Sequence, residues 1–249
     1  MIAQQRKMYI MDTLSKKGIV NIKDVAQDLG VSEITVRRDF EKLENDGKLK
    51  RVQGGAALEE TLGSAELTMR KKLNLNSHNK LLVAQYAEKM VADGDCVFID
   101  GGTTMLPLLE LLVKRPIKLV TYNAMVVRKM TNPAAEIFVV GGKYLPYYSM
   151  FVGVDAQDVL SRYNFDSAFL GCIGVNLGSG ACYTSEMESQ QMKMIGIKNS
   201  RKRYLMVDDS KINQLGFLQF ASLEVFDKVI CNQSAALRAD GVPKNFTLV

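Results

Sequence analysis

Hydrophobic residues at the beginning of the chain predict three short amphipathic helices. Residues 6–17 and 22–29 carry the first two, and a third begins after Ser32 and ends before a turn signal at residues 45–47. Ser32 is a good N-cap, because its hydroxyl can accept a hydrogen bond from an unpaired N–H group at a helix start. The apolar residues that share one face of each helix, and are therefore expected in a core, are Ile10, Met11, Leu14, Ile22, Val25, Ala26, Leu29, Val36, Phe40 and Leu43.

A basic hairpin is predicted directly after the third helix. Residues 48–52 and 56–58 have the pattern of two short strands, and Gln53, Gly54 and Gly55 form the tip between them. Two helices joined by a tight turn and followed by a hairpin are typical of a winged helix-turn-helix. We therefore expect an α+β DNA-binding domain over residues 1–58.

Charged residues lie beside the buried stripe in the first turns of the third helix. Arg38 is the first candidate for a contact with a base edge, and Arg37 for a base or a phosphate, because arginine can bond guanine in two places. Asp39 is expected to orient an arginine or a nearby backbone group, since DNA would repel its charge. Cations on the hairpin suit phosphate contacts, which add affinity without reading sequence. The predicted DNA-binding residues are Ser32, Ile34, Thr35, Arg37, Arg38, Lys48, Lys50, Arg51, Gln53 and Gly54.

These residues carry a family resemblance. The run S-E-I-T-V-R-R-D-F, followed by G-K-L-K-R and G-G-A, resembles the winged helix-turn-helix of the DeoR family of bacterial regulators of sugar metabolism. One departure is Gln53, where the family often has His at the wing tip. The resemblance implies operator DNA as a partner.

Strand and helix patterns alternate in the larger, second part of the chain, which predicts an α/β domain with a parallel sheet. Asn76 is expected to cap a helix that runs to Val91, and a second helix follows the strand 96–99 and extends through Leu112. A long helix is expected to open at residues 183–186. The predicted strands are residues 96–99, 118–121, 136–140, 166–170, 203–207 and 228–231, the last being the final core strand.

Small and polar residues follow several of these strands, and the carboxyl edge of a parallel sheet is where ligand crevices form. After the first strand, two glycines and two threonines precede a helix. Their N–H groups, their hydroxyls and the helix dipole favour an anion, although the run is not a Walker A loop because no GK[ST] follows. The predicted effector-binding residues at these strand ends are Asp100, Gly101, Gly102, Thr103, Thr104, Asn123, Gly141, Gly142 and Gly171.

The larger domain extends the resemblance. The runs IDGGTT, TYNAM, VVGG, FVG, FDSAFLGCIGV, YTSEM and VDDSK resemble the effector domain of the same family, which in turn resembles ribose-5-phosphate isomerase. This implies a sugar-phosphate ligand, held by the glycine–threonine run and by two further residues, Glu186 at the position of the isomerase base and Lys211 at that of a substrate-binding lysine. Two aspartates that the isomerase uses fall here on Leu170 and Ile173, which cannot transfer a proton. The resemblance implies a binding pocket that has lost part of its chemistry.

Composition narrows the choice of function only slightly. The net charge is +5, and residues 1–58 supply +3 of it (11 Lys/Arg minus 8 Asp/Glu), which favours a polyanionic partner there. The four cysteines lack metal-site spacing and are expected to be reduced residues in or near the core of a cytoplasmic protein. No run has the pattern of a signal peptide or a membrane span.

Two smaller features have ordinary explanations. His78, the only histidine, is expected at a surface or helix-capping position, and neither a metal nor a cofactor is predicted. Tyr144, Tyr147 and Tyr148 form an aromatic cluster. We expect core packing for it, with closure of a pocket or a subunit contact as alternatives.

The prediction from the sequence is a winged helix-turn-helix joined, through a linker at residues 59–75, to an α/β effector domain at residues 76–249 that resembles ribose-5-phosphate isomerase. We expect a repressor of a sugar or polyol catabolic operon. It would work in the bacterial cytoplasm and would associate with the nucleoid when it is bound to DNA. Its DNA affinity would depend on a phosphorylated sugar or polyol. One wing and one reading helix make a small interface, which predicts a homo-oligomer, a dimer or a tetramer. Two alternatives stay open, an isomerase-type enzyme with a DNA-binding domain and an activator that senses an unphosphorylated ligand.

Overall fold

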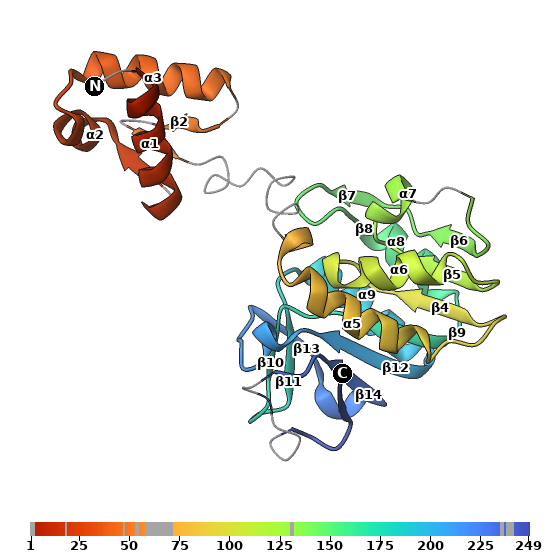
Figure 1. Ribbon diagram of the computed structural model, residues 1–249. Helices are drawn as coiled ribbons and strands as arrows, with labels where there is room; N and C mark the ends of the chain where they lie inside the picture. The colour runs from red at the N-terminus through yellow and green to blue at the C-terminus, as the bar shows by residue number, and fades with distance from the viewer. Residues whose placement is uncertain are drawn as a thin grey trace. The chain divides into compact units, whose positions relative to one another are not determined.

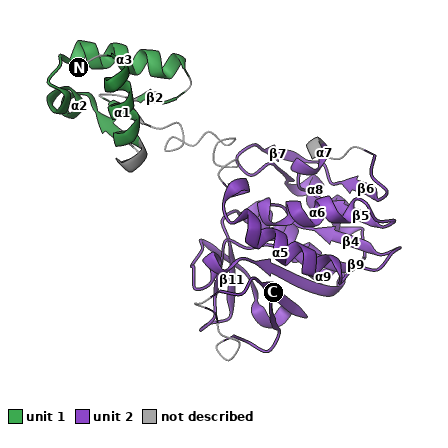
Figure 2. Ribbon diagram, viewed as in Figure 1, with its two compact units in different colours: residues 1–71 green, residues 72–249 purple. Residues whose placement is uncertain are grey.

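The structure is a computed structural model that describes residues 3–17, 19–46, 48–52, 55–57, 72–129, 132–234, 237 and 242–249. The chain forms two compact units, residues 1–71 and 72–249 (Figure 2). The predicted linker, residues 59–75, lies for the most part outside the described residues and stays a prediction.

Unit 1 contains the three predicted helices and a small antiparallel sheet. The sheet has the order β1-β3-β2, so the hairpin is joined by the short strand that precedes the second helix. The pairing of this third strand with the hairpin was not predicted. The elements are α1 (Ala3–Lys17), β1 (Ile19–Asn21), α2 (Ile22–Leu29), α3 (Glu33–Asn45), β2 (Lys50–Val52) and β3 (Gly55–Ala57).

The predicted caps and core of unit 1 are confirmed. Asn21 Oδ1 accepts a hydrogen bond from Lys23 N at 2.9 Å, and Ser32 Oγ accepts one from Thr35 N at 3.3 Å. Met11 differs from the prediction, because it is only partly buried. The core consists of Ile10, Leu14, Val20, Ile22, Val25, Ala26, Leu29, Val36, Phe40, Leu43, Leu49 and Ala56.

Unit 2 is built on a seven-stranded parallel sheet of order β15-β14-β12-β9-β4-β5-β6. The predicted parallel α/β architecture is confirmed, but residues 228–231 are not the last strand, because residues 246–248 pair beside them. The strands are β4 (Cys96–Ile99), β5 (Lys118–Thr121), β6 (Glu136–Val139), β9 (Phe165–Leu170), β12 (Ser200–Val207), β14 (Lys228–Cys231) and β15 (Phe246–Leu248).

Helices cover both faces of this sheet (Figure 1). Helices α5 (Ser77–Glu88) and α6 (Leu106–Leu112) pack together on one face, and α8 (Val154–Ser161) and α9 (Met187–Lys198) pack together on the other. The helix predicted to open at residues 183–186 begins later, at Met187, because Tyr183 and Thr184 belong to a strand.

Smaller elements extend from the carboxyl edge of the main sheet. A second, antiparallel sheet consists of β10 (Gly174–Asn176), β11 (Ala181–Thr184) and β13 (Leu218–Ser222), and a hairpin of β7 (Lys143–Leu145) and β8 (Met150–Val152). None of these five strands was predicted. Short helical turns complete the unit: η1 (Thr103–Met105), α7 (Met125–Lys129), η2 (Asp209–Lys211) and η3 (Leu223–Val225).

Helix α5 buries one face. Val83, Ala84 and Ala87 are fully buried, whereas the apolar Leu81 is 41% exposed. The residue that completes the buried face is Lys80, with 5% exposed surface. Asn76 stands at the N-cap position without a capping hydrogen bond, because its side chain bonds Asp208 and Ser210 instead. A buried lysine at this position calls for a polar partner.

Candidate functional site

The outward face of α3 carries the predicted DNA-reading residues. Ile34 is 65% exposed and the side chain of Arg37 is 62% exposed, although Arg37 directly follows the buried Val36 on the same helix. Arg38 is exposed and makes no hydrogen bond or ion pair within the described part of the chain. The closest ion pair of Arg37, with Glu33, is 4.0 Å long. Both guanidinium groups are therefore available to a partner outside the unit.

Asp39 fixes the position of this helix. Arg6 of α1 donates from Nε to Asp39 Oδ2 at 2.6 Å and from its terminal nitrogen to Oδ1 at 3.2 Å. Asp39 is only 3% exposed. The expectation that Asp39 orients an arginine is confirmed, and the arginine comes from α1 rather than from α3.

The wing is tied to the reading helix at its base. Arg51 donates its backbone N–H to Glu44 Oε1 at 2.9 Å and its Nε to Oε2 at 2.6 Å. Lys48 is exposed. The predicted wing-tip residues Gln53 and Gly54 lie outside the described residues. Arg51 thus has a structural partner in addition to the predicted phosphate contact.

In unit 2, the loop between β4 and α6 has the geometry of an anion-binding turn. Gly101 lies against Tyr122 and Met150, where a Cβ atom would come within 2.5 Å of the Met150 methyl, and Gly102 has a φ of 93°. Only glycine fits this path without strain. Within the described residues no acceptor is found for the N–H groups of Gly102, Thr103 and Thr104, which precede or open η1. They are the unpaired donors of a helix start.

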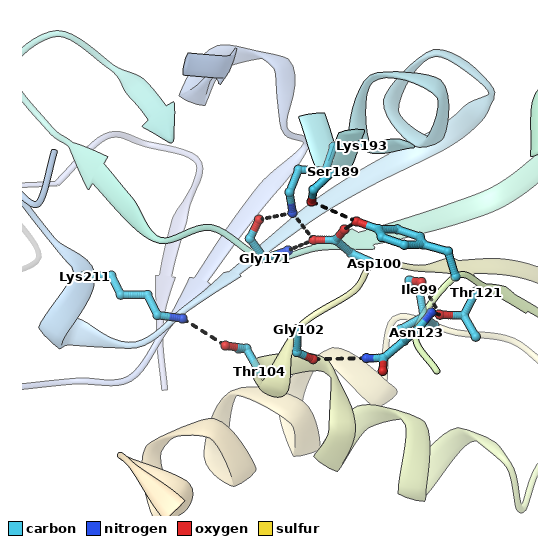
Figure 3. A network of polar contacts seen from close by, with 11 residues as sticks. Ile99, Asp100, Gly102, Thr104, Thr121, Asn123, Gly171, Ser189, Lys193 and Lys211 are labelled. Atoms are coloured by element: carbon cyan, nitrogen blue, oxygen red, sulfur yellow. Dashed lines mark hydrogen bonds and ion pairs between the residues drawn. The ribbon is translucent and has the colours of Figure 1, made fainter. Parts of the chain in front are cut away.

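Two lysines from distant parts of the chain reach the threonines of this loop. Lys211 Nζ donates to Thr104 Oγ1 at 2.9 Å, as Figure 3 shows, and Lys80 Nζ donates to Thr103 Oγ1 at 3.2 Å. Lys211 also lies 3.3 Å from Asp208 Oδ2. Burial, and then repulsion from Lys211, lowers the pKa of Lys80 to about 8. The loop is therefore flanked by two cations, of which Lys211 has the carboxylate of Asp208 beside it.

Asp100 is buried beneath the loop rather than exposed on it. Its carboxylate accepts hydrogen bonds from Tyr122 and Lys193 and, at 2.8 Å, from the N–H of Gly171 (Figure 3). Lys193 donates in addition to the carbonyl of Gly171 at 2.9 Å. Burial, followed by the charge of Asp100, raises the pKa of Tyr122 well above its ordinary value. Asp100 and Gly171 anchor the loop to β9 and α9, which leaves them no surface for a ligand.

The remaining predicted effector residues are placed in different ways. Asn123 Nδ2 donates to the carbonyl of Gly102 at 3.1 Å and thereby supports the loop. A Cβ atom on Gly142 would lie 2.6 Å from Val152 O, so packing alone accounts for this glycine. Glu186 Oε1 accepts a 2.7 Å hydrogen bond from Tyr148 OH. The structure brings together Lys211 with Thr104 and Asn123 with Gly102, while no contact joins Gly141 to them among the described residues.

The aromatic cluster lies at the surface instead of in the core. Tyr144 and Tyr147 are 45% and 38% exposed. The ammonium of Lys72 stands 5.4 Å and 5.3 Å from the ring centroids of Tyr147 and Tyr148. Tyr148 is partly buried and packs against the core, so the expectation of core packing holds for Tyr148 and is wrong for Tyr144 and Tyr147.

Several expectations about chemistry can be compared with the structure. Leu170 is fully buried in the core, and Ile173 is 39% exposed at the start of the loop that leads to β10. The described residues contain no group of histidine, cysteine or acidic side chains that could hold a metal ion, and no described helix is long and apolar enough to cross a membrane. Cys172, Cys182 and Cys231 are buried with free thiols, and His78 is exposed near the start of α5.

Lys80 and Lys193 were missed by the sequence reasoning. Lys80 had a detectable signal, because Lys80, Val83, Ala84 and Ala87 have the spacing of one helix face and a cation on it needs a partner. Lys193 had no such signal, since its partners Asp100 and Gly171 come from distant segments.

Known proteins match both units. A model described as DeoR-like helix-turn-helix domain matches residues 6–62, and one described as DeoR C terminal sensor domain matches residues 75–233. An uncharacterized HTH-type transcriptional regulator named FruR from Bacillus subtilis is 31% identical over 90% of this chain and 88% of its own length. A lactose phosphotransferase system repressor from Staphylococcus aureus is 28% identical over 89% of this chain and 88% of its own.

Solved structures match more loosely. Ribose 5-phosphate isomerase A from Methanocaldococcus jannaschii superposes on 56% of each chain with 21% identity and a TM-score of 0.38. The delta subunit of eIF2B from Chaetomium thermophilum covers 69% of this chain and 60% of its own, with 13% identity and a TM-score of 0.44.

Proposed function

This chain belongs to the DeoR family of DNA-binding transcriptional regulators, and we propose that it represses a sugar or polyol catabolic operon until a phosphorylated metabolite binds unit 2. One relative is named as a repressor of a lactose phosphotransferase system, which supports both the repression and the link to sugar phosphorylation. The protein would act where the bacterial DNA is, in the cytoplasm and on the nucleoid.

We propose that α3 enters the major groove and that Arg38 reads a base edge. Its exposure and its lack of a partner among the described residues support this role. Arg37 would reach a base or a phosphate, and Ile34 a thymine methyl. The hydroxyl of Thr35 lies 2.9 Å from Ser32 Oγ, so its methyl group is the part left for DNA. The wing cations would contact phosphates.

The effector proposal rests on one observation, the convergence of Lys80 and Lys211 on the threonine hydroxyls at the start of a helix. Helix-start N–H groups, two hydroxyls and two ammonium groups suit a phosphate ester, which carries about −1.5 to −2 charges at pH 7 and three acceptor oxygens. An unphosphorylated sugar would leave both lysines without an anion.

A metabolite can control DNA binding only if it binds the two arrangements of the protein unequally, by about 1–3 kcal/mol in typical cases. We propose no reaction for this pocket. Leu170 and Ile173 supply no acid or base, and Asp100 is engaged by Tyr122, Lys193 and Gly171. A homo-oligomer, dimer or tetramer, would let two reading helices meet two half-sites.

A thermal-shift screen of the full chain tests the effector proposal. Hexose, pentose and polyol phosphates are each compared with the unphosphorylated parent compound. A true effector at 100 times its Kd stabilises the protein by about 2.7 kcal/mol. Stabilisation by the parent sugars alone would refute the phosphate site.

Two lysine variants test whether the phosphate binds at the threonine loop. Lys211→Met removes the cation on Thr104 and is expected to weaken binding of the phosphorylated ligand about tenfold or more, since a charge-assisted hydrogen bond is lost. Lys198→Met, at the exposed end of α9, is the matched control and should bind like the wild type. Equal binding by both variants would contradict the assignment.

A further inference from the structure

Lys80 links the threonine loop to the point where the chain enters unit 2. Its ammonium donates to Thr103 Oγ1 at 3.2 Å and to the backbone carbonyl of Lys72 at 2.5 Å. Lys80 is only 5% exposed, so these partners replace bulk water. An ammonium group has three N–H donors, and within the described residues two of them have acceptors. Lys80 thus divides its hydrogen bonds between the threonine loop and Lys72.

The segment that begins at Lys72 is connected to the threonine loop through Lys80. Asn76 Nδ2 donates to Asp208 Oδ1 and to Ser210 Oγ, both at 2.9 Å, and Asn79 Nδ2 donates to Asp209 Oδ1 at 3.1 Å. These bonds hold the start of α5 to the carboxyl edge of β12. The residues before Asn76 are held through the Lys72 carbonyl and through the tyrosine rings beneath the Lys72 ammonium.

Charge around Lys80 is poorly balanced without a ligand. Lys211 and Lys72 both repel it, and Asp208 is the carboxylate that attracts it. Asp208 already accepts hydrogen bonds from Asn76 and Ser210 and pairs with Lys211. The negative charge of a phosphate oxygen attracts an ammonium group more strongly than the dipole of a neutral carbonyl does. An anion at the loop therefore competes with the Lys72 carbonyl for the same ammonium.

We propose that Lys80 binds the phosphate group of the effector and reports it to the linker, by giving up its hydrogen bond to Lys72. This inference rests on the proposed effector site. Binding at the loop draws the Lys80 ammonium towards the anion, and residues 72–75 lose the bond that holds them to α5. The segment that leads from unit 1 is then tied to unit 2 less tightly when the site is occupied.

The two lysines of the loop have different roles in this scheme. Lys211 contacts Thr104 and Asp208 but, among the described residues, not Lys72, so it supplies affinity alone. Lys80 supplies affinity and also the tie, by which we mean its hydrogen bond to the carbonyl of Lys72. Lys211→Met should therefore need more phosphate to leave the unliganded arrangement, whereas Lys80→Met should resemble the liganded one even when no phosphate is present.

Hydrogen exchange of the full chain, followed by mass spectrometry, measures the tie directly. Inorganic phosphate is the probe, with potassium chloride at equal ionic strength as the control. In the wild type, a peptide covering residues 72–79 should exchange at least threefold faster with saturating phosphate. Lys211→Met should show the same change at higher phosphate concentration, and Lys80→Met should exchange fast in both conditions.

A matched variant controls for changes in α5 itself. Lys228 of β14 lies 3.4 Å from Tyr86 OH and stacks over the Tyr86 ring, so it contacts α5 from the opposite edge of the sheet. Lys228→Met should leave the exchange of residues 72–79 and its response to phosphate unchanged. Lys80→Met could fail to fold, which circular dichroism would show. In that case the exchange of residues 72–79 in the wild type and in Thr103→Val decides whether the tie exists. Thr103→Val keeps the Lys72 bond and should respond only at higher phosphate.

Different results overturn different conclusions. If phosphate stabilises the wild type but leaves the exchange of residues 72–79 unchanged, the tie is wrong and the effector site stands. Slow exchange in a folded Lys80→Met variant also refutes the tie. If neither inorganic phosphate nor any sugar phosphate stabilises the wild type, the proposed function fails, whatever the exchange of Lys80→Met shows.

Discussion

The cations of α3 and the buried lysines around the threonine loop are exposed in opposite ways. On α3 of unit 1, Arg37 and Arg38 point outward, and the nearest ion pair of Arg37 is 4.0 Å long. In unit 2, Lys80 and Lys193 are 5% and 4% exposed and each donates to at least two acceptors.

This difference matches the sizes of the proposed partners. DNA is an extended polyanion that meets cations on a surface, and displaced counterions supply much of the affinity. A phosphate ester is small and can be enclosed, so the cations that bind it are positioned beforehand by the fold. Exposed cations cost the fold little, whereas buried ones depend on every neighbour.

Asp100→Asn should give the largest effect, because it leaves the ammonium of Lys193 buried without its counter-charge. The expected loss is about 3–5 kcal/mol of unfolding free energy. Eight of the nine tyrosines lie in unit 2 and the chain has no tryptophan, so tyrosine fluorescence in guanidinium chloride reports unit 2 selectively. Arg162→Ala breaks the exposed pair with Asp158 and should cost no more than about 0.5 kcal/mol. Equal losses in both variants would remove the distinction between the two kinds of cation.

The Arg38→Ala variant tests the role of the exposed cations on α3. We expect specific binding to weaken by about 1–3 kcal/mol, roughly 5- to 150-fold, without a loss of folding stability. The DNA is selected from random duplexes with the wild type, and Kd is measured by gel shift at fixed salt. Lys42→Ala, an exposed change near the end of the same helix, should affect binding much less. An unchanged Kd for Arg38→Ala would exclude it as the base-reading residue.

Raising the pH should weaken phosphate binding, because Lys80 loses its proton and its positive charge. Its pKa is lowered to about 8 by burial and by Lys211, while Asp208 acts in the opposite direction and Lys72 adds to the repulsion. Only the protonated form binds the anion well, so affinity is full below pH 8 and falls as the pH rises through it. Between pH 7 and pH 9 we expect a loss of about tenfold, or about 1.4 kcal/mol. Calorimetric titration with the best sugar phosphate checks this, and a constant Kd across the range would contradict it. Lys80→Met should bind weakly at every pH.

Glu44→Gln should have the smallest effect. It removes the charge that holds Arg51, but exposed pairs contribute only about 0.2–1 kcal/mol. The Arg51 guanidinium becomes more available to phosphates, so the salt dependence of DNA binding should steepen slightly, by less than about one unit of slope. Gel shifts at several salt concentrations measure that slope. A large loss of stability would show that the base of the wing is more important to the fold than its exposure suggests.

Local patterns in the sequence predicted unit 1 well because its contacts are mostly local. The stripe of Val36, Phe40 and Leu43, the Ser32 cap and the hairpin were all readable within a few residues. The pairing of Ile19–Asn21 with the hairpin could not be read, since it joins segments more than thirty residues apart. In unit 2 the six predicted main-sheet strands were found because each is a short apolar run.

The site was harder to predict because its residues meet only in three dimensions. The glycine–threonine loop and Lys211 were predicted, and the structure places Lys211 on Thr104. Asp100 was expected to face the ligand, but burial and the partners Tyr122 and Lys193 place it underneath. The sequence shows neither which charge is buried nor which distant lysine it meets.

Strand β15 closes one edge of the main sheet. Residues 246–248 pair with residues 229–231, and Val249 exchanges further hydrogen bonds with Cys231 and Gln233. A chain shortened before Phe246 would present the bare edge of β14, an apolar strand with unpaired backbone groups. Such an edge can pair with the same edge of another molecule and start aggregation. The last four residues should therefore decide whether unit 2 stays dispersed at high concentration.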